Sequence, residues 1–133
     1  MFPLDTKILI IDDSSLARQN IKTVLLGLDF HNIHEASDGE SGIKAIFEAS
    51  SERSAFGLIL LDINMPGING LEVAKRIREK KELAELPIIF ITARGQQKQV
   101  EEGLASGGNR YITKPFTQGE LKINLERLWS KFH

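Results

Sequence analysis

The sequence predicts an α/β fold in which a five-stranded parallel sheet is covered by helices on both faces. Three runs of four apolar residues, 8–11, 58–61 and 88–91, contain no polar position. Such runs are typical of strands that are buried on both sides. Helical periodicity separates consecutive runs, and strands that alternate with helices imply right-handed crossovers within a parallel sheet.

Alternating strands and helices can be placed along the whole chain. The strands are expected at residues 7–11, 33–36, 57–61, 87–91 and 110–113. The helices are expected from the Asp13-Ser14-Ser15 caps to about residue 28, after the turn at 37–39, over 70–81, over 96–106 and after Pro115. The last helix carries an apolar face at Leu121, Leu125, Leu128, Trp129 and Phe132.

The helix at 96–106 differs from the other four because it has little to bury. Val100 and Leu104 are its only large apolar residues, and Gly103 inside it costs about 1 kcal/mol relative to alanine. Two interpretations stay open. The segment is either a poorly packed surface helix or a helix that shifts when a site at the neighbouring strand end is occupied.

Composition points to one domain over residues 1–133 with no output domain, since 133 residues match the usual size of a single domain. The lack of cysteine excludes disulfides and thiolate metal sites. A formal net charge of -1, from 17 basic and 18 acidic residues, gives no reason to expect nucleic acid or an anionic membrane as a partner. No apolar run approaches a membrane span and no signal peptide is visible, so we expect a cytoplasmic protein.

Polar side chains stand where the apolar runs end. Asp12 and Asp13 follow the first long run, and Asp62 follows the second. Thr92 follows the third, and Lys114 follows the weaker run at 111–113. In parallel α/β sheets ligands bind outside the carboxyl ends of the strands. The sequence therefore predicts that three carboxylates, one hydroxyl and one ammonium gather at one edge of the sheet.

This set of groups suits Mg²⁺ and a phosphoryl group. Two carboxylates about 4 Å apart repel by about 4 kcal/mol at an effective dielectric constant near 20, so three of them must protonate, pair with Lys114 or bind a divalent cation. Oxygen ligands without histidine or cysteine favour Mg²⁺. Mg²⁺ and Lys114 would neutralise a phosphoryl group in transfer, and an aspartate can be the nucleophile that accepts it. The Thr92 hydroxyl can donate to a phosphoryl oxygen without adding negative charge.

Each residue alone has a simpler explanation. Asp13 and Thr92 could only cap the helices that follow them. Asp62 could only open the turn before Pro66, and Lys114 could be only a solvated charge. Together the residues favour a site, because chance would scatter them over both ends of the strands.

Four segments resemble the receiver domain of two-component response regulators, and the resemblance covers about residues 7–129. Ile10-Ile11-Asp12-Asp13-Ser14 resembles the acidic pair after the first strand. Leu60-Leu61-Asp62-Ile63-Asn64-Met65-Pro66-Gly67, with Gly70, resembles the phosphoacceptor segment. Ile91-Thr92-Ala93 resembles the switch hydroxyl, and Tyr111-Ile112-Thr113-Lys114-Pro115-Phe116 resembles the ending of the fifth strand.

The resemblance implies a flavodoxin-like strand order of 2-1-3-4-5 and a binding role for the acidic residues. Asp62 would accept a phosphoryl group from the phosphohistidine of a histidine kinase. Asp13, Asp62 and the backbone carbonyl of Asn64 would bind Mg²⁺ directly, whereas Asp12 would bind it through a water. Lys114 would pair with the phosphoryl group, and its peptide bond to Pro115 would be cis.

The resemblance also implies two switch residues. Thr92 would move toward the phosphoryl oxygen, and Tyr111 would turn inward into the space that Thr92 leaves. The alternative for Tyr111 is a fixed aromatic side chain of the edge strand.

Two positions depart from the family pattern. The segment Gly107-Gly108-Asn109-Arg110 stands where the family often has Gly-Ala-Asp, and acidic residues that help DNA-binding members dimerise are absent there. We therefore expect a monomer. The second residue after Thr92 is Arg94, which is bulky and cationic. We hypothesise that Arg94 alters the access of water to Asp62 and hence the lifetime of the phosphate.

The resemblance implies a stand-alone phosphoacceptor response regulator rather than an enzyme: a self-phosphorylating switch with slow autodephosphorylation. Its partners would be a sensor histidine kinase or histidine phosphotransfer protein, and a downstream protein that binds the face formed by the fourth helix, fifth strand and fifth helix. The Asp12-Asp13-Ser14-Ser15 segment followed by Arg18 looks most like the chemotaxis regulator that binds the flagellar motor switch.

Four alternatives stay open. The chain could be a phosphorelay shuttle, or a receiver excised from a longer regulator. A Mg²⁺-dependent aspartyl phosphatase is disfavoured, because such an enzyme would want an acid where Asn64 stands. A degenerate receiver that only binds partners is disfavoured by the intact acidic set, Thr92 and Lys114.

Overall fold

The computed structural model describes residues 1–93 and 97–133 and contains one parallel sheet in the order β2-β1-β3-β4-β5. The strands are β1 (Ile8–Ile11), β2 (Ile33–Ala36), β3 (Leu58–Asp62), β4 (Ile88–Ala93) and β5 (Arg110–Lys114). The helices are α1 (Ser15–Gly27), α2 (Gly39–Ser51), α3 (Gly70–Arg78), α4 (Gln97–Ser106) and α5 (Gln118–Phe132), with a 3-10 turn, η1 (Lys81–Leu83). This confirms the flavodoxin-like α/β fold.

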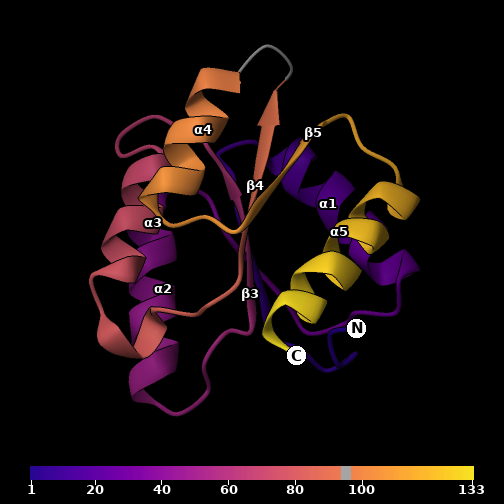
Figure 1. Cartoon of the computed structure of the whole chain (residues 1–133), viewed down its shortest axis with the longest axis horizontal. Coiled ribbons are helices and arrows are strands. Elements are labelled where there is room, and N and C mark those ends of the chain that lie inside the picture. The colour runs from indigo at the N-terminus through magenta and orange to yellow at the C-terminus, as the bar shows by residue number, and fades with distance from the viewer. Residues whose placement is uncertain (94–96) are drawn as a thin grey trace.

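Helices cover both faces of the sheet. In Figure 1, α1 and α5 lie on one face, and α2, α3 and α4 lie on the other. Alternate strand residues enter separate cores, as the pleat of a strand requires. Ile8 and Ile10 of β1 pack with α1 and α5, whereas Leu9 and Ile11 pack with α2 and α3. The continuous apolar runs of the sequence therefore have their physical cause in a sheet that is buried on both sides.

Side-chain caps set the start of four helices. Each cap oxygen accepts a hydrogen bond from a backbone N–H that has no partner within the helix. The pairs of cap and donor residue are Ser14 and Ala17, Asp38 and Ser41, Asn69 and Glu72, and Thr117 and Glu120.

Three strands extend further at their carboxyl ends than the apolar runs predict. β3 includes Asp62, β4 includes Thr92 and Ala93, and β5 includes Lys114. The register pairs Asp62 with Ile91, and Ala93 with Lys114. Apolar runs end where side chains become polar, but the backbone ladder continues, so these polar residues have strand geometry rather than loop geometry.

The helix expected over 70–81 is shorter than predicted, since α3 ends at Arg78. Lys80 is extended, and η1 then turns the chain so that Leu83 is buried at 4% exposure. The guanidinium of Arg78 donates from Nη1 to the Leu83 carbonyl at 2.7 Å. A continued helix would not bring Leu83 into the core in this way.

Glycine has a packing role in α4 that the sequence did not reveal. A Cβ added at Gly103 would come within 2.8 Å of Cε2 of the Phe90 ring, and one added at Gly108 would overlap the same ring. Val100 is buried beside them, whereas Leu104 is 39% exposed. The two glycines let α4 and its carboxyl-terminal turn lie directly against β4, so alanine would not be the better residue at 103.

Within the two described ranges, 1–93 and 97–133, no helix is both long and apolar enough to cross a membrane.

Candidate functional site

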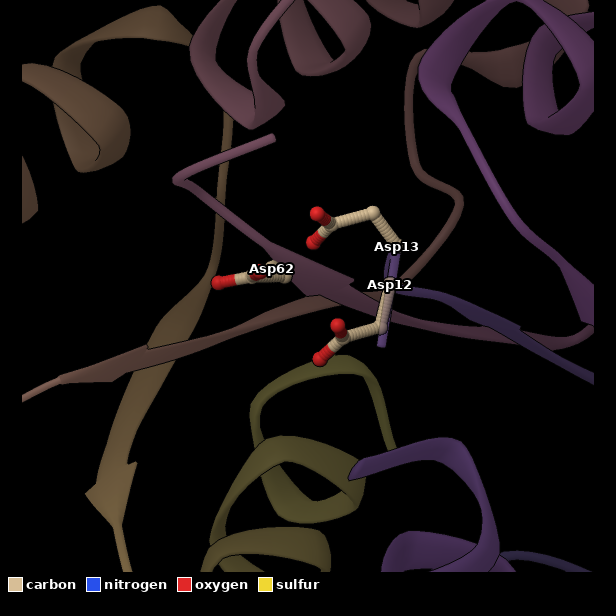
Figure 2. A group of neighbouring side chains, drawn as sticks. All are labelled: Asp12, Asp13 and Asp62. Carbon is tan, nitrogen blue, oxygen red and sulfur yellow. The ribbon is translucent and has the colours of Figure 1, made fainter. Parts of the chain in front are cut away.

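Three carboxylates converge at the carboxyl edge of the sheet. Asp12 and Asp13 follow β1 and Asp62 ends β3, which are neighbouring strands. Figure 2 shows the three side chains directed toward a common region. One oxygen from each lies within 4.8 Å of the other two. The predicted acidic cluster is therefore assembled, with Asp12 and Asp62 buried and Asp13 exposed.

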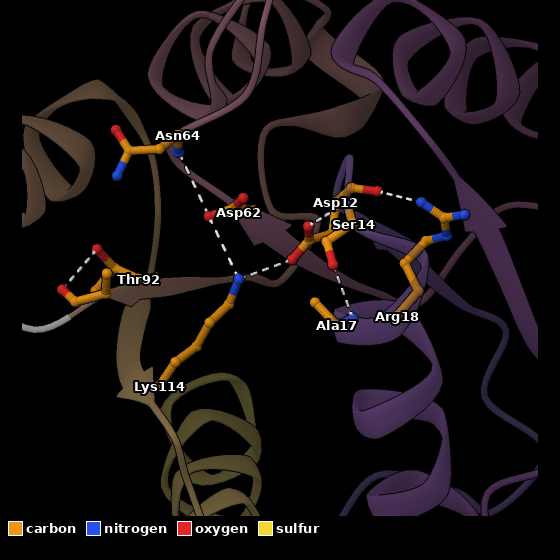
Figure 3. A network of polar contacts seen from close by, with 9 residues as sticks. Asp12, Ser14, Ala17, Arg18, Asp62, Asn64, Thr92 and Lys114 are labelled. Carbon is orange, nitrogen blue, oxygen red and sulfur yellow. Dashed lines mark hydrogen bonds and ion pairs between the residues drawn. The ribbon is translucent and has the colours of Figure 1, made fainter.

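Every polar atom of Asp12 has a hydrogen-bond partner. Its amide donates to the Ala36 carbonyl at 3.2 Å, which continues the contact between β1 and β2. Its carboxylate accepts from the Ser14 amide at 2.9 Å and from Lys114 Nζ at 2.9 Å. Its carbonyl accepts from Arg18 Nη1 at 2.6 Å, as Figure 3 shows. At 1% exposure Asp12 needs these partners, because a buried carboxylate is costly without them.

Asp62 has fewer hydrogen-bond donors than Asp12, and its pKa is raised. Its carboxylate accepts a long hydrogen bond from the Asn64 amide at 3.4 Å, and Lys114 Nζ stands 3.8 Å away. Burial and, after it, the Asp12 carboxylate raise the pKa of Asp62 to about 6 against the opposing charge of Lys114. Asp62 is thus the less compensated of the two buried carboxylates.

Lys114 joins β5 to the acidic cluster. Its side chain is 31% exposed, and its ammonium bridges toward Asp12 and Asp62. The following peptide bond to Pro115 is cis, as the resemblance implies. Lys114 is therefore a member of the site and not only a solvated charge.

Thr92 lies at the end of β4, the strand beside β3, and is 1% exposed. Its hydroxyl donates to the Ala93 carbonyl over 3.4 Å, which is a weak contact. In Figure 3 Thr92 stands on the Asp62 side of the cluster, apart from the Lys114 ion pair. A buried hydroxyl with a weak partner can change partner at little cost.

Tyr111 points outward in this structure, at 43% exposure. It lines a groove of ≈ 540 Å³ between β5 and α5. Leu104 of α4 and Ile123 of α5 line the same groove and are also exposed, at 39% and 49%. The face of α4, β5 and α5 therefore presents apolar side chains to solvent.

The simpler explanation of Asp13 does not hold, because Ser14 caps α1 through a bond from the Ala17 amide at 3.1 Å. The Asp13 carboxylate is left exposed at the mouth of the cluster. The hypothesis about Arg94 concerns a residue that lies outside the described ranges.

Two arginines have roles that pattern reasoning missed, Arg18 beside the site and Arg78 at the opposite edge of the sheet, where β4 and β5 begin. Arg18 contacts the backbone of Asp12. Arg78 donates to the Gly107 carbonyl at 2.9 Å and to Asn109 Oδ1 at 3.2 Å, and Asn109 Oδ1 also accepts from the Ile88 amide. Desolvation lowers the pKa of Arg78, which has oxygen acceptors around it but no carboxylate within salt-bridge distance among the described residues. The segment that departs from the family pattern is thus fixed from α3.

The donor set fits a hard divalent cation. Three carboxylate oxygens stand within 4.8 Å of one another, and the cluster contains neither sulfur nor imidazole. Asp62 has a raised pKa because it is buried and lies beside the Asp12 carboxylate, and a bound cation would favour its ionised form. These features suit Mg²⁺, which takes one or two carboxylates together with phosphoryl oxygens.

Comparison with known proteins agrees with this site. The model of the response regulator receiver domain matches residues 8–126. The chemotaxis protein CheY-3 of Vibrio cholerae is 38% identical over 125 residues, which cover 94% of this chain and 92% of that protein. Chemotaxis protein CheY4 of Vibrio cholerae, a solved structure, superposes with a TM-score of 0.79 at 28% identity, covering 93% of this chain and 98% of that one.

A second solved structure bears on the metal. The receiver domain of the sensor histidine kinase PA1611 of Pseudomonas aeruginosa was solved with a magnesium ion coordinated in its active site cleft. It superposes with a TM-score of 0.79 at 29% identity, covering 93% of this chain and 97% of that one. From the family match, the fold and the acidic edge together, the chain belongs to the response regulator receiver domains, which are signalling switches.

Proposed function

We propose that this receiver accepts a phosphoryl group on Asp62 in a Mg²⁺-dependent transfer from the phosphohistidine of a histidine kinase or a histidine phosphotransfer protein. The observation that carries the proposal is the convergence of three carboxylate oxygens within 4.8 Å beside the Lys114 ammonium. Residues 1–133 would act as one receiver unit, built around a single sheet.

Asp62 is the proposed nucleophile because, of the two buried carboxylates of the cluster, it has the weaker hydrogen bonds. One of its oxygens attacks phosphorus, an acyl-phosphate P–O bond forms, and the P–N bond to the donor imidazole breaks. The electron pair of that bond returns to the imidazole nitrogen. Attack needs the ionised carboxylate. A pKa of about 6 leaves most of Asp62 ionised at neutral pH.

Asp13, Asp62 and the backbone carbonyl of Asn64 are the proposed direct ligands of Mg²⁺, and Asp12 would act through a water. The magnesium ion in the active site cleft of the PA1611 receiver supports Mg²⁺ as the cation of such a site. When bound, the ion would supply positive charge against the phosphoryl oxygens. Lys114 supplies a second positive charge from the β5 side, and it can turn from Asp12 toward a phosphoryl oxygen on Asp62.

Thr92 and Tyr111 are the proposed switch. The Thr92 hydroxyl has only a 3.4 Å contact to give up, and a phosphoryl oxygen on Asp62 would be a stronger acceptor. Tyr111 is 43% exposed and can turn inward once Thr92 has moved. A shift from 1:99 to 99:1 between two such states takes about 5.5 kcal/mol of differential stabilisation.

The proposed output is a protein–protein contact on the face formed by α4, β5 and α5. Exposed Leu104, Tyr111 and Ile123 give this face an apolar surface. Relatives such as CheY-3 of Vibrio cholerae and CheY of Pseudomonas aeruginosa are chemotaxis proteins, which favours a chemotaxis partner. We propose that the chain meets both partners in the cytoplasm as a monomer, and that its phosphate is lost slowly by autodephosphorylation. A phosphorelay shuttle is the second candidate, because the same site could return the phosphoryl group to a histidine.

Intact mass after incubation with acetyl phosphate tests the proposal. We expect the wild-type protein to gain one phosphoryl group when Mg²⁺ is present and none when it is chelated. Asp62→Asn should gain none in either case, whereas the exposed control Asp29→Asn, far from the cluster in sequence, should behave as wild type. Turnover of a phosphoester without a protein adduct would instead favour an aspartyl phosphatase.

A further inference from the structure

Arg18 is a mostly buried cation next to the acidic cluster that the proposed chemistry does not use. It lies at the beginning of α1, and its side chain is 15% exposed. The amino end of a helix carries partial positive charge, so a cation there is unfavourable. The first turn of α1 contains no acidic residue to offset it. The position of Arg18 therefore needs specific partners.

The partners of Arg18 are the backbone of Asp12 and the side chain of Glu35. Helix side chains lean toward the amino end of their helix, which carries Arg18 back over the end of β1. Nη1 donates to the Asp12 carbonyl at 2.6 Å, and Nε donates to Glu35 Oε1 on β2 at 3.1 Å. Figure 3 shows the guanidinium directed at Asp12 from the side opposite Lys114.

The contact with the carbonyl bears on Asp13. The Asp12 carbonyl belongs to the peptide that joins Asp12 to Asp13, and a planar peptide with a fixed oxygen has a fixed orientation. The Asp12 amide is already fixed by Ala36. Among the described residues, no hydrogen bond holds the Asp13 carboxylate itself, so its direction depends on the backbone that carries it.

We propose that Arg18 is a positioning residue, which orients the Asp12–Asp13 peptide so that the Asp13 carboxylate faces the cation site. The proposal rests on the proposed function, because it assigns Asp13 to Mg²⁺. Arg18 itself touches neither the cation nor the phosphoryl group. Its bond to a neutral carbonyl is charge-assisted, which makes it stronger than an ordinary peptide hydrogen bond.

Mg²⁺ titration by calorimetry, without any phosphodonor, measures the effect. Arg18→Met keeps an aliphatic stem and removes every donor, and we expect about 10-fold weaker Mg²⁺ binding. Arg18→Lys keeps the charge but loses the guanidinium fork, so its Mg²⁺ affinity should fall between those of wild type and Arg18→Met. Two matched controls should stay within about twofold of wild type. Glu35→Gln keeps an acceptor for Nε, and Arg76→Met removes an arginine that pairs with Glu72 and Glu40 away from the cluster.

Two further readouts separate positioning from a general structural role. In the metal-free protein, the amide NMR signals of Asp13 and Ser14 should move in Arg18→Met and stay in place in Arg76→Met. With acetyl phosphate, Arg18→Met should be slow at limiting Mg²⁺ and recover at saturating Mg²⁺. A purely structural loss would lower the melting temperature and leave the Mg²⁺ affinity unchanged.

Unchanged Mg²⁺ affinity in folded Arg18→Met would overturn the proposal. So would an equal loss in Glu35→Gln, since the ion pair and not the carbonyl contact would then be responsible. If Arg18→Met does not fold, Arg18→Lys against Glu35→Gln decides by the same criterion. If wild type itself does not bind Mg²⁺, the proposed function fails, and the metal-free NMR signals alone decide whether Arg18 orients Asp13.

Discussion

The Lys114 ammonium lies 2.9 Å from Asp12 Oδ2 and 3.8 Å from Asp62 Oδ1, so the cation of the site is bound to Asp12 and only adjacent to Asp62. Asp12 is satisfied by this bond and by the Ser14 amide. Asp62 is left with a single long hydrogen bond. This asymmetry gives two buried carboxylates at the same sheet edge different electrostatic environments.

Removal of the Lys114 charge should raise the pKa of Asp62 above its value of about 6. The ammonium opposes the effects of burial and of Asp12, and Lys114→Met deletes it while keeping much of the stem. A carbon-detected NMR titration of the Asp62 carboxyl in metal-free protein measures the shift. Lys114→Arg keeps the charge and should change the pKa much less; an Asp62 pKa that is the same in wild type and Lys114→Met would contradict the assigned electrostatics.

Asp62→Asn should make the metal-free protein more stable at neutral pH. Burial raises the pKa of Asp62 from 3.8 to about 6, so between these values the folded protein holds a proton that the unfolded chain has released. The contribution of Asp62 to the free energy of unfolding therefore falls as the pH rises through this window, and it is lowest above about pH 6.

Urea unfolding of wild type and Asp62→Asn in chelator gives the size of this effect. The variant should be more stable by about 1–2 kcal/mol at pH 7, and the difference should vanish below about pH 4. The exposed Asp5→Asn controls for general effects of charge. Equal free energies of unfolding for Asp62→Asn and wild type at both pH values would show that the buried Asp62 carboxylate does not destabilise the folded protein.

Substitution by alanine should be tolerated at one helix glycine, Gly119, and not at another, Gly103. At Gly103 of α4 a Cβ would come within 2.8 Å of the Phe90 ring, whereas at Gly119 of α5 its nearest neighbour is 3.9 Å away. Gly103→Ala should lose about 1–3 kcal/mol from overpacking against the ring. Gly119→Ala should be neutral or gain up to about 0.5 kcal/mol from helix propensity. Chemical denaturation compares the two, and a stabilising Gly103→Ala would contradict the close contact of α4 with β4.

The fold could be predicted well from the sequence because its strongest signal is also its main stabilising feature. The runs 8–11, 58–61 and 88–91 are apolar at every position, because the sheet is buried on both faces. For β3, β4 and β5 the apolar runs predict carboxyl ends that are one or two residues short, because polarity marks the end of the core and not the end of the ladder. The strand order came from family resemblance and is confirmed.

The position of the acidic cluster and of Lys114 could also be predicted, because these residues directly follow the apolar runs and therefore lie at the carboxyl ends of parallel strands. The contacts of Arg18 and Arg78 could not be predicted, because the sequence pattern suggests a solvated charge at both positions. In the structure Arg18 is mostly buried and Arg78 is half-buried, and both donate hydrogen bonds. One signal for Arg18 was available in the sequence: a cation at the beginning of a helix, where the dipole disfavours it. The roles of Thr92, Tyr111 and Asn64 remain predictions.

The most direct test of the central claim is to locate the phosphoryl group on the chain. Borohydride reduction of the acetyl-phosphate-treated protein converts an acyl-phosphorylated aspartate to homoserine, and peptide mass spectrometry identifies its position. We expect homoserine at residue 62, dependent on Mg²⁺ and absent at residues 12 and 13. Homoserine at Asp12 or Asp13, or none at any residue while the protein binds Mg²⁺ and phosphodonor, would contradict the assignment of Asp62 as the phosphoacceptor.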